Sequence, residues 1–241
     1  MSVTDKSIVL EPRNLKQRLT MPYKKMLLFM LSFAFLCGCH STTAFAGYLT
    51  RGPISEDHRD FYIGTATGAY IPTGPDQSGY ATGVGISFHV GYQFIKYLSA
   101  ELGYHGESGS FNSNGVKGGW QLIEPVDVDI KPILPLSAWD NVYMVFGTGF
   151  GGYDDRVIEQ IPGRDVGLQG FIYNIGIGYE RYLHDGHFSI SCAVVYRSFT
   201  SKQAISSVGG QTDTFTLPYR IDRSKLAVEI WVFWRFFRNK K

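Results

Sequence analysis

The chain has 241 residues, of which 44% are hydrophobic and 15% aromatic, and its formal net charge is only +2. This apolar content excludes a chain that is disordered by composition, and the near-neutral charge excludes a basic nucleic-acid-binding protein. The length fits one domain preceded by a leader segment.

Two segments are expected to precede the folded domain. Residues 1–20 form an unusual extension, and Met21, which stands directly before Pro-Tyr-Lys-Lys, would be an ordinary start. Residues 21–46 have the features of a secretory signal peptide: a basic start, an apolar run over 26–39 and the small-x-small end Ala44-Phe45-Ala46. The apolar run is shorter than the roughly 20 residues that a spanning helix requires. The alternative is a single membrane anchor of a soluble domain.

The site of processing has two interpretations. Cleavage after Ala46 leaves residues 47–59 as an N-terminal periplasmic segment, and we favour this possibility. Leu36-Cys37-Gly38-Cys39 also resembles a lipoprotein box, in which Cys39 would be lipidated. After cleavage at Ala46, Cys192 is the only cysteine that remains, so no internal disulfide is expected.

Beyond residue 60, apolar side chains recur with a period of two, which indicates β-strands. The clearest case is 226–237, where one face is an unbroken apolar row. Pro132 and Pro135 are expected to end the fourth strand, because proline cannot donate to a ladder. The eight predicted strands are residues 61–71, 83–93, 98–105, 126–131, 142–151, 171–180, 188–197 and 226–237.

The links between these strands alternate strictly in length. The short links are residues 95–97, 132–141 and 182–187, and the long ones are residues 72–82, 106–119, 152–167 and 199–222. Short turns at one end and long loops at the other are typical of outer-membrane barrels. We therefore predict an all-β fold over residues 60–241: an eight-stranded antiparallel up-and-down transmembrane barrel, closed by pairing of the first and last strands.

Alternation alone also fits a soluble eight-stranded barrel whose apolar face points inward. The positions of the aromatic residues on the apolar face favour a membrane barrel, because such rings prefer the membrane–water interface. The predicted turn-end girdle consists of Phe61, Tyr92, Phe94, Tyr179, Phe188, Trp234 and Phe236. The predicted loop-end girdle consists of Tyr104, Phe150, Phe171, Tyr173 and Tyr196.

The opposite face combines glycines, which leave room, with charged side chains of both signs. Eight strands enclose an interior that side chains largely fill, and buried charges are tolerable only when paired. The predicted interior charges are Glu101, Asp127, Asp129, Lys131, Glu180, Arg197, Glu229 and Arg235, with Lys225 at the loop edge. The first interpretation is a salt-bridge network that holds the barrel together. The second is a charged gate whose rearrangement opens a small conduit.

With Gly91-Tyr92-Gln93-Phe94 leading through a short turn into 98–104, and with the glycine-rich stretch 146–151, the chain resembles the small eight-stranded outer-membrane barrels. This family includes the OmpA transmembrane domain, OmpX and OmpW-like proteins. The resemblance implies a location in the outer membrane, contact with lipopolysaccharide and insertion by the barrel-assembly machinery. Family members usually end on an aromatic residue that this machinery reads, whereas here Phe237 is followed by four further residues. The resemblance covers the barrel alone, so we do not expect the peptidoglycan-binding domain of OmpA-type proteins.

An enzymatic function is not expected. His187-Phe188-Ser189 has the His-x-Ser spacing of outer-membrane enzymes that modify lipid A. However, with Phe188 on the lipid face its two neighbours would point into the lumen at the turn end, away from the outer leaflet. No P-loop, Cys-x-x-Cys pair or His-Glu-x-x-His motif is present, and Asp140 and Asp154-Asp155 are interpreted as turn residues rather than a calcium site. We therefore expect no cofactor and no metal.

Two functions remain open at the level of the sequence. The first is a structural and surface-interaction protein whose outer loops, especially 199–222, contact host surfaces, other cells or defence factors, because long loops on a rigid scaffold commonly carry binding residues. The second is a narrow channel for small or amphipathic solutes, which the interior charges and glycines suggest. The loop composition names no ligand.

Overall fold

A computed structural model describes residues 60–74, 77, 79–113, 116–155, 165–183, 186–208 and 211–236. No helix in this part of the chain is long and apolar enough to cross a membrane. The predicted extension 1–20, signal peptide 21–46, lipidation site Cys39 and periplasmic segment 47–59 lie outside the described residues, as does Phe237 with the four residues after it.

The described chain is a succession of strands that close into a barrel. Each strand pairs antiparallel with the next, and β8 pairs with β1. The closing register places Phe61 opposite Phe236 and Ile71 opposite Leu226, so the sheet has no free edge along this seam. The predicted fold class is confirmed. The strands are β1 (Asp60–Pro72), β2 (Gly83–Ile95), β3 (Leu98–Ser113), β4 (Val116–Pro135), β5 (Asp140–Asp155), β6 (Asp165–Leu183), β7 (Phe188–Val208) and β8 (Gln211–Phe236).

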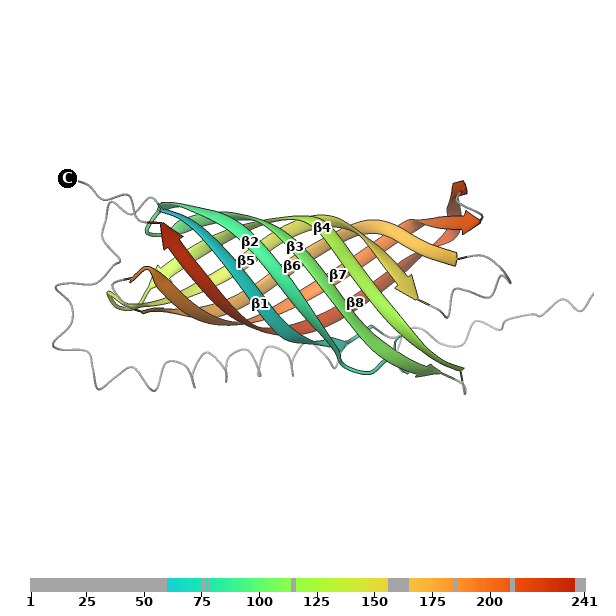
Figure 1. The fold of residues 1–241 in the computed structure, drawn as a ribbon, viewed down its shortest axis with the longest axis horizontal. Coiled ribbons are helices and arrows are strands. Elements are labelled where there is room, and N and C mark those ends of the chain that lie inside the picture. Colours follow the sequence, from blue (N-terminus) through green and yellow to red (C-terminus); the bar gives the residue numbers. More distant parts are fainter. Residues whose placement is uncertain are drawn as a thin grey trace, which may run out of the picture. The chain divides into compact units, whose positions relative to one another are not determined.

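Several strands are longer than the alternation predicted. The expected loops 106–119 and 199–222 are largely strand, so that part of the prediction is wrong, and the described ends of 152–167 belong to β5 and β6. The stretches 106–119 and 199–222 are rich in small and polar residues and have no apolar row, so their sequence lacks the signal of a strand with one apolar face. Their backbones nevertheless stay paired, and in the β7–β8 hairpin the ladder continues to Val208 opposite Gln211. Figure 1 shows the β3–β4 hairpin in green and the β7–β8 hairpin in orange extending at the same end of the barrel.

The turn end of β4 also differs from the prediction. The strand continues to Pro135, so Pro132 does not end it. Pro132 lies opposite Leu98, the first residue of β3. The missing N–H therefore interrupts the ladder only where the neighbouring strand begins.

A third proline, Pro125, lies at a β-bulge in β4. The register with β5 shifts between Ile123 and Val126. A bulge adds one residue to a strand and thereby changes which positions face inward. Glu124 and Asp127 consequently both point into the barrel, and each is fully buried.

The inward glycines make room for side chains from neighbouring strands. Aromatic rings occupy much of this room, whereas the sequence had suggested charged side chains alone. At Gly178 an added Cβ would lie 2.3 Å from Cζ of Tyr143, and at Gly91 it would lie 2.2 Å from Cζ of Tyr62. The barrel interior is therefore closely packed by rings that fit against bare backbone.

We expect Gly178→Ala to lower the free energy of unfolding by about 1–3 kcal/mol, because the methyl group would displace the buried Tyr143 ring. Gly167→Ala on the same strand is the matched control, since its Cβ would meet nothing closer than 3.9 Å. Urea unfolding of the purified barrel in detergent micelles measures both. Equal stability of the two variants would contradict the proposed packing.

Candidate functional site

The predicted interior charges are all buried inside the barrel. They come from β3, β4, β6, β7 and β8, and each side chain belongs to a residue that is at most 7% exposed. Lys225, which was expected at the loop edge, is fully enclosed at 1% exposure. The eight predicted residues are Glu101, Asp127, Asp129, Lys131, Glu180, Arg197, Glu229 and Arg235.

At the turn end, Arg235 of β8 organises the interior. Its Nη2 donates to Oε1 of Glu180 at 2.6 Å, and its Nη1 donates to Oε1 of Gln93 at 2.9 Å. The guanidinium carbon lies 4.7 Å from the ring centroids of both Tyr62 and Tyr182. A delocalised cation between a carboxylate and two ring faces is suited to a site without water.

The next group along the barrel axis centres on Glu101 of β3. Nζ of Lys131 and the hydroxyl of Tyr62 each donate to Oε1 of Glu101 at 2.7 Å. Nδ1 of His89 lies 2.9 Å from Oε2. Lys131 also lies 4.3 Å from the ring centroid of Tyr143. Both oxygens of this carboxylate are therefore satisfied, as a buried charge requires.

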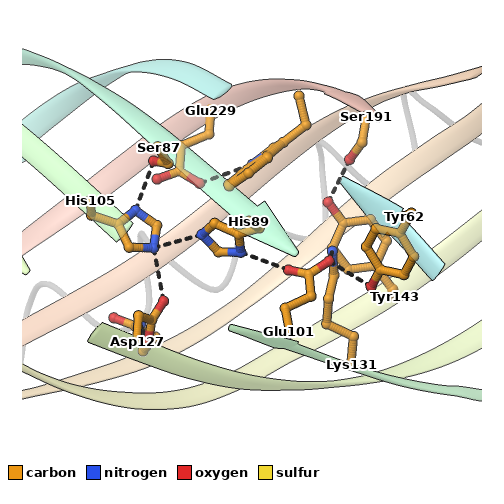
Figure 2. Close-up of polar contacts among 12 residues, drawn as sticks. Tyr62, Ser87, His89, Glu101, His105, Asp127, Lys131, Tyr143, Ser191 and Glu229 are labelled. Atoms are coloured by element: carbon orange, nitrogen blue, oxygen red, sulfur yellow. Dashed lines mark hydrogen bonds and ion pairs between the residues drawn. The ribbon is translucent and has the colours of Figure 1, made fainter. Parts of the chain in front are cut away.

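In the middle of the barrel two histidines face each other. Nε2 of His89 lies 2.9 Å from Nε2 of His105, which also lies 2.8 Å from Oδ2 of Asp127. On the far side of its ring, Nδ1 of His105 lies 2.7 Å from Oγ of Ser87. With Asp129, these side chains offer four possible ligand atoms that all lie within 4.8 Å of one another. Figure 2 shows His105 between Ser87 and Asp127, with its ring directed at His89.

Arg197 of β7 reaches the same level from the opposite wall. Its Nη2 donates to Oε1 of Glu229 at 3.0 Å, and its Nη1 lies 3.4 Å from Oε2 of Glu124. Nη2 also lies 3.3 Å from Nε2 of His105. The Tyr70 hydroxyl donates to Glu229 at 2.9 Å. One guanidinium thus serves two carboxylates and contacts the histidine pair.

Nearer the loop end, Lys225 and Glu107 form a separate ion pair. Nζ of Lys225 donates to Oε1 of Glu107 at 2.6 Å and lies 4.3 Å from the ring centroid of Trp120. The two residues are separated by 118 positions in the chain. The pair bridges β3 and β8 across the barrel interior.

Four participants were absent from the predicted charge network. His89 and His105 lie on the polar rows of β2 and β3, so the alternation of these strands could have placed both side chains in the interior. Glu107 falls in a stretch expected to be a loop, and Glu124 precedes the Pro125 bulge. The last two could be found only once the length and register of β3 and β4 were known.

The interior of the described barrel carries an excess of negative charge. Asp127 and Asp129 have no Lys or Arg within ion-pair distance among the described residues. Nine carboxylates of the described residues are buried, against the four buried Lys and Arg side chains Lys131, Arg197, Lys225 and Arg235. Asp60 and Asp140 lie at the turn end, and the other seven are Glu101, Glu107, Glu124, Asp127, Asp129, Glu180 and Glu229. Protons or a bound cation must offset the remainder, because an uncompensated buried charge is costly.

The aromatic residues of the predicted girdles lie on the outside of the barrel. Most are exposed, from Phe61 at 60% to Tyr104 at 38%, and Tyr92, Tyr179 and Tyr196 are half-exposed. Their location at membrane interfaces stays a prediction.

The His187-Phe188-Ser189 segment does not assemble a histidine–serine pair. Ser189 is buried and its hydroxyl donates to Oε1 of Glu180. His187 is exposed, so its predicted orientation into the lumen is wrong. The reason is that His187 precedes the first residue of β7 and lies outside its alternation.

A closed eight-stranded up-and-down barrel with exposed apolar side chains outside and paired charges inside is the fold of the small outer-membrane barrels. Neisserial surface protein A has this fold: with 11% identity, the match covers 73% of this chain and 97% of that one at a TM-score of 0.54. OprG from Pseudomonas aeruginosa is 13% identical, with coverage of 76% and 99% and a TM-score of 0.47. No protein-family model matches the chain, and no curated protein is significantly similar to it. At such low identity the likeness shows the fold alone.

We expect Lys225→Met to destabilise the barrel by about 3–5 kcal/mol, because it leaves the Glu107 carboxylate buried without its cation. The double variant Lys225→Met with Glu107→Leu should recover much of this loss. Arg220→Met, which breaks an exposed ion pair with Asp222, should change stability by at most about 1 kcal/mol. Urea titration measures all three. A double variant that is no more stable than Lys225→Met would show that the loss does not come from an unpaired Glu107 carboxylate.

Proposed function

We propose that this protein resides in the outer membrane and uses the extended hairpins at its loop end to bind partners outside the cell, without catalysing a reaction. The observation that carries the proposal is the exposed β7–β8 hairpin, which stands beyond the predicted outer aromatic girdle. Insertion by the barrel-assembly machinery and contact with lipopolysaccharide of the outer leaflet belong to the same proposal.

The outer surface supports the membrane location. Between the two predicted girdles the exposed side chains are mostly aliphatic, for example Leu102 at 56%, Val128 at 48% and Ile230 at 56%. Soluble proteins rarely expose continuous apolar surface of this extent, because water disfavours it. The charged side chains of the same strands are turned inward, as a lipid environment requires.

The β7–β8 hairpin supports a binding role. β7 continues for twelve residues past Tyr196, to Val208, which corresponds to about 40 Å of strand. On β8 the stretch 213–220 is exposed on both faces of the strand, apart from the half-buried Leu217. It carries Tyr219 at 65% exposure and Phe215 at 39%. Exposed aromatic side chains on a paired scaffold are well suited to a protein or glycan partner.

The interior gives less support to the alternative of a narrow channel. Large side chains such as Trp120, Tyr62 and Phe233 are fully buried within the barrel. Together with the paired charges they fill the space that a conduit would need. A gate would require several of these contacts to break at once.

Ile230→Arg tests the lipid-facing surface. Ile230 lies midway between Leu226 and Trp234 on β8, so in a membrane the charge would cost roughly 2–4 kcal/mol of stability. Thr214→Arg, in the exposed hairpin, should cost nearly nothing. Unfolding of the barrel from lipid vesicles in urea provides the measurement. A neutral or stabilising effect of Ile230→Arg would indicate a water-facing surface and overturn the membrane location.

Trimming the β7–β8 hairpin tests the binding role. Gln203 pairs with Thr216, so residues 204–215 can be replaced by an Asn-Gly turn that keeps the ladder below intact. Cells displaying the trimmed barrel should bind cultured epithelial cells at least about tenfold more weakly, because the tip of the hairpin is lost together with the exposed Phe215.

The matched control for this experiment is the β3–β4 tip, where an Asn-Gly turn can replace residues 113–116 between the paired Asn112 and Lys117. Heat-modifiable gel mobility verifies that each barrel is folded. Adhesion that is unchanged after trimming of 204–215, in a folded barrel, would contradict the proposal.

A further inference from the structure

We propose that His89, His105, Asp127 and Asp129 bind one divalent transition-metal ion inside the barrel, with Zn²⁺ as the ion that best fits the ligand set. The four residues come from β2, β3 and β4, and each is at most 4% exposed. Their possible ligand atoms all lie within 4.8 Å of one another. The proposal concerns the interior and does not depend on the surface-binding function.

The two imidazoles are arranged as metal ligands rather than as an ordinary hydrogen-bonded pair. Glu101 holds Nδ1 of His89 at 2.9 Å, and Ser87 holds Nδ1 of His105 at 2.7 Å. A carboxylate accepts only, so the His89 proton belongs on Nδ1 and its Nε2 carries a lone pair. That lone pair points at Nε2 of His105, 2.9 Å away.

The same holds for His105, although its tautomer follows from more than one contact. Its Nε2 faces the guanidinium of Arg197 at 3.3 Å, and guanidinium groups only donate. With the proton on Nδ1 toward Ser87, Nε2 of His105 also presents a lone pair to the centre. Two lone pairs 2.9 Å apart, beside the Asp127 carboxylate, repel one another unless a cation or a proton lies between them.

The outer contacts are those of a metal site. Metal-bound histidines commonly donate the other ring N–H to a carboxylate or another oxygen, which orients the ring and selects the tautomer. Glu101 does this for His89 and is itself fixed by Lys131 at 2.7 Å. Asn174 donates to Oδ1 of Asp127 at 3.0 Å, which leaves Oδ2 directed at the centre.

The spacing of the atoms needs only small shifts. With Zn–N and Zn–O distances of about 2.0–2.1 Å, neighbouring atoms of a tetrahedral site lie roughly 3.3 Å apart. The separations between Nε2 of His105 and its two neighbours in the cluster are 2.9 and 2.8 Å, and no pair of ligand atoms exceeds 4.8 Å. Two imidazoles and two carboxylates are a ligand set that suits Zn²⁺.

The charge of the centre favours a divalent cation. Asp127 and Asp129 have no ion-paired Lys or Arg among the described residues, and one M²⁺ ion would neutralise them. Oδ1 of Asp129 is buried and has no hydrogen-bond partner in the described structure. The nearby Arg197 opposes cation binding, but its charge is already offset by Glu229 and Glu124.

The ion would join three consecutive strands in the middle of the barrel, where rings and ion pairs lie on both sides. We therefore expect it to enter most readily as the barrel forms, and to stabilise the folded state once bound.

The test uses the full barrel, refolded into detergent micelles after chelator treatment, both with and without Zn²⁺. After desalting, we expect one zinc per barrel by elemental analysis of the sample refolded with Zn²⁺. We also expect Co²⁺ added in the same way to give the visible absorption bands of a tetrahedral site. Ser87→Ala, which removes the support of His105, should weaken the apparent zinc affinity roughly 10–100-fold.

The ligand variants are His89→Gln, His105→Gln and the two combined, which keep polar side chains of similar reach. The matched control is His187→Gln, because His187 is exposed at the turn end. Heat-modifiable mobility selects the folded fraction of every variant, and each zinc content is measured on that fraction. Zinc lost from the double variant and retained in His187→Gln supports the site. The proposal is overturned if the folded wild-type barrel contains no zinc after refolding with Zn²⁺. It is also overturned if the folded double variant retains zinc.

Discussion

Closure of the sheet is the constraint on which the rest of this structure depends. Once β8 pairs with β1, the inward side chains of all the strands share a narrow space of fixed size. Glycines are required where rings such as Tyr62 and Tyr143 cross the interior. Because water has little room there, each buried charge must find its partner on another strand.

The outer and inner faces of the barrel wall carry opposite kinds of side chain. The outer face exposes mostly apolar side chains, while the inner face satisfies charges through pairs such as Lys131 with Glu101 and Arg235 with Glu180. The exception is the middle of the barrel, where carboxylates outnumber Lys and Arg. This excess connects the packing of the interior to the proposed metal site, because a divalent ion would offset two of the negative charges without a further change in the fold.

Sequence reasoning identified the strands best where the outer face of the barrel is an apolar row. The core of each strand was predicted because an apolar row of period two is a local property of the chain. The β3–β4 and β7–β8 extensions have no such row, so they were interpreted as loops. Glu124 was not predicted as an interior charge for a related reason. The bulge at Pro125 changes which positions of β4 face inward without changing the composition of the strand.

The sequence by itself determined the class of fold, the order of the strands and the face on which each predicted charge lies, since all of these depend on alternation within single segments. Tertiary structure decided which side chains contact one another inside the barrel. Lys225 and Glu107 are 118 residues apart, and the convergence of His89, His105 and Asp127 depends on the register of three strands. Register and closure are set jointly by all the strands, and no one segment carries that information.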